Sequence, residues 1–165
     1  TLVSMDNTIK ILSWNINGLK SALNLHDTIN NLLKSLNSDI ICFQETKLPV
    51  LNQSRLCISD DYYSYFSCCR SQQAYSGTAT FIRKSISIPC IKAQEGLTGL
   101  IGCYATNTNT NTNGNNNDRV ILMTEEELGM SYEEALVLDN EGRVVITGML
   151  LVYILYRYCV YVIYV

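Results

Sequence analysis

Two short polar segments of this sequence carry groups that can bind a hard metal ion. The first contains Asn15 and Asn17, which supply amide oxygens, and the second contains Glu45, which supplies a carboxylate. Each segment closes a short apolar run, at residues 9–14 and 40–43, that is typical of a β-strand. We therefore expect both clusters at the carboxyl ends of two strands of one sheet, where their oxygens can bind a divalent cation such as Mg²⁺. The alternatives are a surface Glu45 that caps the next loop and an Asn15 that forms an Asx turn.

The elements expected to position these clusters alternate between strands and helices, which predicts an α/β fold. Asp27 is the predicted N-cap of a helix that runs to Leu36, because the apolar residues between them fall on one face. Ser131 begins a capping box into a second, short helix. The other predictions are a short helix and loop at 51–61, turns at 71–77 and 139–142, and strands at 10–14, 39–44, 62–68, 78–82, 86–91 and 143–147.

The composition fits one globular domain with a core, since the chain has 165 residues of which 47% are hydrophobic. The net charge is −3 and the twelve Lys and Arg residues are scattered, whereas a protein that binds duplex DNA usually has a basic face. A local basic groove is still compatible with these numbers. The seven cysteines include no C-x-x-C pair, which excludes a zinc ribbon, and we expect a reducing compartment with Cys42 as a buried thiol.

Two tracts stand apart from the rest of the chain. Residues 106–117 alternate Asn and Thr without apolar partners, which predicts a flexible insertion. Residues 149–165 carry one charge, on Arg157, among aliphatic and tyrosine side chains. For this tail we favour an aberrant or truncated C-terminus over a genuine strand. A membrane anchor is the third alternative, disfavoured because the segment is short and has a central Arg.

Five stretches, in this order along the chain, resemble one enzyme family. They are S-W-N-I-N-G-L-K at 13–20, Q-E-T-K-L at 44–48, Y-S-G-T-A-T-F at 75–81, Q-E-G-L-T-G-L at 94–100 and L-D-N-E-G-R at 138–143. The first three resemble the exonuclease/endonuclease/phosphatase superfamily in its exonuclease III branch. The last two resemble the type-2 apurinic/apyrimidinic (AP) endonucleases, with the likeness running over about residues 9–148.

This resemblance implies both a fold and an activity. The fold would be the N-terminal part of a two-sheet α/β sandwich with an incomplete second sheet, formed by residues 1–148. The activity would be Mg²⁺- or Mn²⁺-dependent hydrolysis of DNA 5′ to an abasic site in base excision repair, with 3′–5′ exonuclease or 3′-phosphodiesterase side activity. The implied partner is abasic DNA and the implied compartment is the nucleus, with cytoplasm and mitochondrion as alternatives.

The resemblance also assigns roles to individual residues. Glu45 would be the metal ligand, and Asn15 would hydrogen-bond the catalytic groups beside the metal. Asn17 stands where the wider branch often has Asp, so the resemblance gives it a supporting or weakly ligating role. The residues expected to contact DNA are Lys20, Lys47, Arg70 and Tyr75.

Two later segments of the family pattern do not occur in this sequence. The family uses a G-D-x-N segment and a C-terminal S-D-H segment to activate water and stabilise the leaving oxygen, and the chain contains no Gly-Asp pair. Its single histidine, His26, lies near the first helix, away from any such context. We therefore expect the chain alone to be inactive. The alternatives are another phosphodiesterase or phosphatase of the superfamily and a truncated fragment without enzymatic activity.

Overall fold

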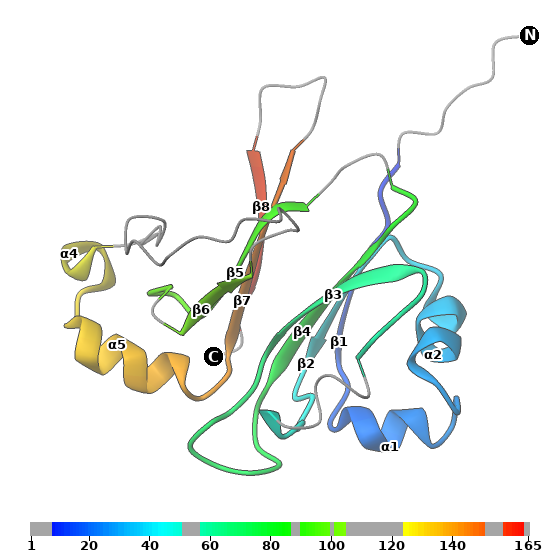
Figure 1. The fold of residues 1–165 in the computed structure, drawn as a ribbon, viewed down its shortest axis with the longest axis horizontal. Helices are drawn as coiled ribbons and strands as arrows, with labels where there is room; N and C mark the ends of the chain where they lie inside the picture. Colours follow the sequence, from blue (N-terminus) through cyan, green and yellow to red (C-terminus); the bar gives the residue numbers. More distant parts are fainter. Residues whose placement is uncertain are drawn as a thin grey trace, which may run out of the picture.

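The computed structural model describes residues 8–50, 57–86, 90–99, 101–104, 124–150 and 157–163 (Figure 1). The predicted flexible insertion at 106–117 lies outside the described residues, as does most of the helix predicted within 51–61. The described part is a mixed α/β structure with two sheets, which confirms the predicted fold class.

The first sheet has the strand order β1-β2-β4-β3 and carries the polar segments of interest. Its strands are β1 (Ile11–Asn15), β2 (Ile40–Gln44), β3 (Tyr62–Ser67) and β4 (Thr78–Arg83). β1 and β2 are parallel and in register, with Asn15 opposite Gln44, while β4 is antiparallel to both of its neighbours. Because β1 and β2 run in the same direction, the loops that follow them emerge at one edge of the sheet.

The second sheet has the order β6-β5-β7-β8. Its strands are β5 (Cys90–Glu95), β6 (Gly102–Tyr104), β7 (Val144–Leu150) and β8 (Arg157–Ile163). β5 begins later than the strand predicted at 86–91, and β6 was not predicted. Within the tail 149–165, residues 157–163 form β8, antiparallel to β7. No helix among the described residues is long and apolar enough to cross a bilayer.

Two helices cover one face of the first sheet, α1 (Leu19–Leu23) and α2 (Ile29–Leu36), beside β1 and β2 in Figure 1. Leu32 and Leu33 of α2 are fully buried and join Phe43 and Phe81 in one core cluster. The rings of Phe43 and Phe81 meet edge to face with centroids 5.6 Å apart, a favoured aromatic geometry. Burial of this apolar face is what fixes α2 on the sheet.

The helix cap predicted at Asp27 is wrong by one residue. Thr28 is the N-cap of α2, in extended conformation, and its hydroxyl accepts a hydrogen bond of 3.2 Å from the amide of Asn31. Asp27 has a φ of 63° and belongs to the turn after α1, so its side chain is not placed to cap the helix. Both residue types are good caps, and the turn geometry decides between them.

A second core cluster lies between the two sheets. Cys42 of β2 and Ile82 of β4 belong to one buried cluster with residues of the second sheet that include Ala93 and Val145. Cys42 is buried as predicted, and this burial raises the pKa of its thiol. Trp14 is 40% exposed and contacts the core edge-on through Phe43, because β1 is the outermost strand of its sheet.

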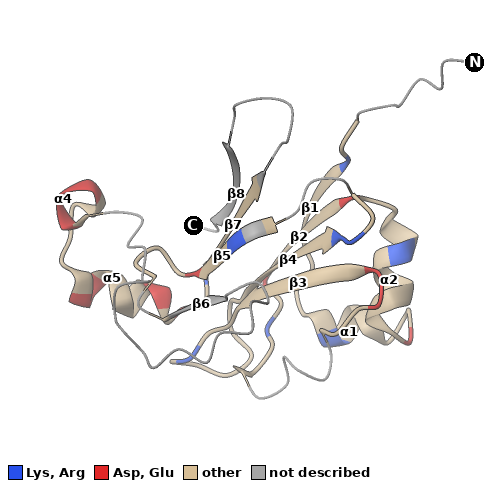
Figure 2. Cartoon of the chain, turned by 45° about the horizontal axis from the view of Figure 1, so that its top comes forward, with Lys and Arg blue, Asp and Glu red and all other residues tan. Residues whose placement is uncertain are grey.

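The acidic helices lie at the other end of the molecule, α4 (Glu125–Leu128) and α5 (Tyr132–Asp139) (Figures 1 and 2). Each begins with a capping box. Ser131 and Glu134 satisfy each other's backbone amides at α5, as predicted, and Thr124 and Glu127 do the same at α4. The carboxylates of Glu127 and Glu134 therefore cap the first turns of their own helices.

Candidate metal and phosphate site

Backbone hydrogen bonds join the loop after β1 to the loop after β2. The amide of Ile16 donates to the carbonyl of Gln44 at 3.0 Å, and the amide of Gly18 donates to the carbonyl of Glu45 at 2.7 Å. The amide of Leu19, at the start of α1, donates to the carbonyl of Thr46 at 2.9 Å. The parallel pairing of the two strands thus continues past their ends and fixes the polar segments beside each other.

The turn before β4 forms the third side of the site. The amides of Thr46 and Lys47 each donate at 2.9 Å, to the carbonyls of Gly77 and Ser76 respectively. Gly77 has a φ of 90°, and a Cβ at this position would lie 2.4 Å from Thr46 Oγ1. Only glycine therefore fits where these two loops touch.

Several non-glycine residues around the site adopt left-handed backbone conformations. The φ values are 47° at Asn17, 51° at Glu45, 53° at Lys47 and 48° at Ser76. Each such residue costs about 1–2 kcal/mol relative to an ordinary conformation, and Asn alone is commonly found there. Strain of this kind persists where the surrounding structure enforces it, and it is concentrated at functional sites.

The polar side chains at this edge form one connected cluster. Asn15 Nδ2 donates to Glu45 Oε1 at 2.9 Å, and Asn15 Oδ1 accepts from the amide of Asn17 at 3.1 Å. Lys47 Nζ lies 2.5 Å from Asn17 Oδ1 and 3.3 Å from Glu45 Oε2. The two polar segments therefore meet, and Asn15 makes the Asx turn named as its alternative while it also orients Glu45.

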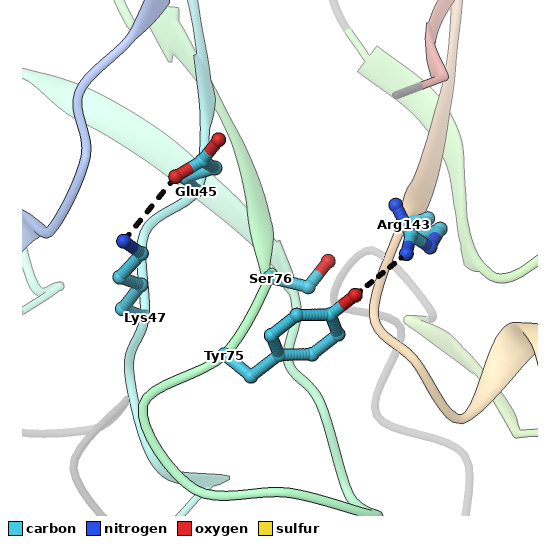
Figure 3. A pocket seen from close by; sticks show the side chains of 5 residues that line it. All are labelled: Glu45, Lys47, Tyr75, Ser76 and Arg143. Carbon is cyan, nitrogen blue, oxygen red and sulfur yellow. Dashed lines mark hydrogen bonds and ion pairs between the residues drawn. The ribbon is translucent and has the colours of Figure 1, made fainter. Parts of the chain in front are cut away.

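A small pocket of about 180 Å³ opens beside this cluster (Figure 3). It is lined by Glu45, Lys47, Tyr75, Ser76 and Arg143. Arg143 Nη2 donates to the hydroxyl of Tyr75 at 3.0 Å, and its guanidinium stands 5.8 Å from the centre of the tyrosine ring. Two cationic groups and one carboxylate therefore face one space, a combination suited to a phosphate group and a cation.

Arg143 is a site residue that the sequence analysis missed. Its guanidinium also donates to Glu141 at 2.5 Å, and this hydrogen bond is the main reason why the pKa of Arg143 is raised, so the side chain is held as a cation. It comes from the second sheet, just before β7, whereas the other residues of the pocket lie in loops of the first sheet. The signal in the sequence was the L-D-N-E-G-R stretch, which ends on this residue.

Two of the predicted DNA contacts lie elsewhere. Lys20 is exposed on α1 and does not line the pocket. Arg70 binds Glu95 through two hydrogen bonds, of 2.6 Å and 2.8 Å, so its guanidinium is held at the junction of the sheets. A DNA contact by Lys20 or Arg70 stays a prediction that no contact in the structure supports. His26, in the turn after α1, also lies outside the residues that line the pocket.

The donor set of the cluster suits a hard cation that keeps most of its water. No group of three or more His, Cys, Asp or Glu side chains is arranged for a metal within the described residues, so Glu45 is the carboxylate on which a site here depends. The Lys47 ammonium already lies between a carboxylate oxygen and an amide oxygen, which shows that this spot favours a positive charge. Asn15 turns its nitrogen to Glu45, so in this conformation it orients the carboxylate instead of offering an oxygen.

Comparisons with known proteins agree with this geometry. The catalytic domain of Xenopus laevis APE2 superposes with a TM-score of 0.67 at 32% identity, over 94% of this chain and 45% of that one. The AP endonuclease of Leishmania major shares the fold, with a TM-score of 0.59 at 21% identity, over 94% of this chain and 40% of that one.

Curated relatives match over most of the chain. "DNA-(apurinic or apyrimidinic site) endonuclease 2" of Mus musculus is 36% identical and that of Xenopus laevis 39%, each over 84% of this chain. The chain spans only 26% and 24% of these relatives' own lengths. Residues 12–148 match the model of the endonuclease/exonuclease/phosphatase family, and the chain belongs to this family.

Proposed function

We propose that this chain supplies the cation-binding part of an AP endonuclease, which hydrolyses the DNA phosphodiester 5′ to an abasic site in base excision repair. The observation that carries the proposal is the hydrogen-bonded cluster of Asn15, Asn17, Glu45 and Lys47 beside a pocket with two cationic side chains. The names of the mouse and frog relatives support the choice of substrate. A DNA repair role makes the nucleus the proposed compartment.

The residues of the cluster have distinct proposed tasks. Glu45 holds Mg²⁺ or Mn²⁺, Asn15 fixes the orientation of the carboxylate, and Asn17 lends its amide oxygen. Such a cation polarises a phosphoryl oxygen and stabilises the charge that develops on it. Lys47 and Arg143 attract the DNA phosphate, and Tyr75 holds the Arg143 guanidinium toward the pocket.

Hydrolysis requires further groups that this sequence does not contain in recognisable form. Water must be activated and the leaving oxygen stabilised, and general acid or base groups typically contribute about 10²–10⁴-fold each. The resemblance assigns these steps to the G-D-x-N and S-D-H segments, neither of which occurs among the 165 residues. We therefore propose that this chain by itself does not incise abasic DNA at a useful rate.

An incision assay tests the proposal. A synthetic abasic duplex is incubated with Mg²⁺ and either the 165-residue chain or a chimera in which residues 1–148 are followed by the remainder of the Xenopus APE2 catalytic domain. We expect incision by the chimera alone, and loss of that incision in Glu45→Gln but not in Glu126→Gln, an exposed carboxylate on α4. Incision by a Glu45→Gln chimera at the unmodified rate would refute the role of Glu45.

A further inference from the structure

The ammonium group of Lys47 occupies the position between the two best oxygen donors of the cluster. It is bound to Asn17 Oδ1 at 2.5 Å. It also lies 3.3 Å from Glu45 Oε2, the contact drawn in Figure 3. These are the same two oxygens that the proposed function assigns to a divalent cation. Two positive groups can therefore occupy this one site, the Lys47 ammonium and a divalent cation.

The backbone holds Lys47 in this place without burying its side chain. Its amide donates to Ser76 at 2.9 Å and its φ is 53°, so the start of the side chain is fixed. The side chain itself is 34% exposed and that of Glu45 is 25% exposed. Ion pairs with this much access to water are weak, and a lysine side chain can swing on its four-carbon stem. The contact of Lys47 with Glu45 and Asn17 therefore forms in the absence of a cation, but it is weak enough for a cation to replace it.

We propose that Lys47 acts as a built-in competitor for the divalent cation and that cation binding releases it toward the substrate phosphate. This inference rests on the proposed function of Glu45. Lys47 Nζ must leave Glu45 Oε2 and Asn17 Oδ1 before these oxygens can accept a cation. The released ammonium then faces the pocket that Tyr75 and Arg143 also line, where a DNA phosphate needs positive charge. The cation and the phosphate are thereby coupled through one side chain.

The other charged groups around the pocket do not replace Lys47 in this role. Arg143 also lines the pocket, but its guanidinium is bound to Glu141 and to the hydroxyl of Tyr75. Replacing Lys47 with a neutral residue therefore removes the ammonium from both oxygens without placing the Arg143 guanidinium on them. Lys47→Met then isolates the competition, while Lys47→Arg retains a positive charge at the same position.

The experiment measures Mn²⁺ affinity from the electron paramagnetic resonance signal of free Mn²⁺, with the full 165-residue chain and no DNA. We expect millimolar affinity in the unmodified chain and a roughly two- to fivefold gain in Lys47→Met, the range that loss of a weak ion pair allows. Lys47→Arg should show little or no gain. The matched control is Lys34→Met, which removes the same charge from the exposed pair of Lys34 with Asp61.

The outcomes separate this inference from the proposed function. If Glu45→Gln removes Mn²⁺ binding but Lys47→Met does not strengthen it, the competition is refuted while the metal site stands. If Lys34→Met gains as much as Lys47→Met, the effect is one of net charge and the inference is also refuted. If Glu45→Gln has no effect on binding in the Lys47→Met background, the proposed metal site itself fails. Far-UV circular dichroism of every variant verifies that the fold is kept.

Discussion

Glu45 and Glu95 each face a cationic side chain, but their surroundings are very different. Glu95 is held by Arg70 through two hydrogen bonds, of 2.6 Å and 2.8 Å, and its side chain is only 4% exposed. Glu45 lies 3.3 Å from Lys47 at the rim of a pocket, with 25% of its side chain exposed. The first pair has the short, two-pronged geometry of a permanent contact, and the second has the geometry of an exchangeable one.

The backbone near Glu95 is less strained than the backbone near Glu45. Beside Glu95, the segment 96–98 packs against Asp139, and we call this contact the Asp139 clasp. The Asp139 carboxylate accepts hydrogen bonds from the amides of Leu97 and Thr98 and from the Thr98 hydroxyl. Here glycines take the left-handed positions, as at Gly96 and Gly142. Around Glu45, glycines take two positive-φ positions, Gly18 and Gly77, but Asn, Glu, Lys and Ser take four more.

This contrast separates a structural junction from a site that can bind and release. The clasp combines buried charge, saturated hydrogen bonding and relaxed backbone, and it ties α5 to the end of β5. The sheet edge at Glu45 combines solvent-accessible charged side chains with a strained backbone. Such strain lowers stability and is concentrated at functional sites. Each of the following predictions tests a part of this difference, in decreasing order of effect.

The largest loss of stability is expected from Gly142→Ala. The φ of Gly142 is 71°, and an added Cβ would lie 2.4 Å from the backbone carbon of Cys68, which cannot move aside alone. Backbone strain and overpacking together should lower the free energy of unfolding by about 3–5 kcal/mol. Gly129→Ala is the matched control, since its φ is 67° and a Cβ there meets nothing within 4 Å. Urea denaturation should show that Gly129→Ala lowers the free energy of unfolding by about 1 kcal/mol. Equal losses in the two variants would refute the close approach of residue 142 to the backbone of Cys68.

Removal of the two carboxylates should have unequal effects on stability. Glu95→Ala leaves Arg70 without its buried partner, and because the Arg70 side chain is 32% exposed we expect a loss of about 3 kcal/mol, at the low end for broken buried pairs. Glu45→Ala should change the free energy of unfolding by less than about 1 kcal/mol. Urea denaturation of both variants measures this, and a greater loss for Glu45→Ala would reverse the comparison.

The strain at Glu45 predicts that glycine is tolerated there better than alanine. At a φ of 51° alanine keeps the unfavourable conformation, whereas glycine adopts it freely. Glu45→Gly should therefore be more stable than Glu45→Ala by about 1 kcal/mol. Both variants lack the carboxylate, so the difference in their urea midpoints reports the backbone alone. An alanine variant of equal or higher stability would show that residue 45 is not strained.

The smallest effect is expected at Glu134, whose carboxylate belongs to the capping box of α5. Hydrogen bonds from the backbone amide of Ser131, and then from its hydroxyl, lower the pKa of Glu134 below its usual value. A lowered pKa in the folded state means that the cap stabilises α5 above the usual carboxyl pKa and is lost as the pH falls through the lowered value. The protection factors of the amides at the start of α5, which compare each exchange rate with the intrinsic rate at the same pH, should therefore fall in acid.

The control for this effect is chosen from the same helix turn. Glu134→Gln should weaken the acid-dependent change in exchange, while Glu133→Gln, which removes a neighbouring carboxylate of the first turn, should leave it in place. An unchanged pH profile in Glu134→Gln would mean that the capping box does not control the helix end.

The parts of the fold that the sequence predicted are those set by local pattern. Residues 40–44 are apolar enough to be recognised as an inner strand, and the Ser131 capping box is complete within four positions. β6 was not predicted, and a strand in the tail that contains β8 was only the second alternative, because both strands depend on pairing with β5 and β7 and not on their own alternation. The choice of Thr28 over Asp27 as cap depends on the backbone of the preceding turn, which neighbouring residue types do not reveal.

The candidate site was predictable to a similar degree. The meeting of Asn15 and Glu45 follows from parallel strands whose carboxyl ends share an edge, so two local predictions were enough. The position of Arg143 opposite Tyr75 requires the two sheets to pack face to face, a long-range arrangement that no single stretch encodes. The ion pair of Arg70 with Glu95 was missed for the same reason, because its partners lie on different sheets.

The claim that Glu45 binds the cation is tested by locating the bound cation on the chain. Mn²⁺ is added in small steps to the ¹⁵N-labelled protein, and the broadening of each amide signal is followed by NMR. We predict that amides of residues 15–18 and 45–47 broaden first, and that Glu45→Gln removes this effect. Broadening that begins instead at the acidic helices α4 and α5, or at Glu95, and that is unchanged in Glu45→Gln would contradict the claim that Glu45 is the exchangeable, cation-binding carboxylate.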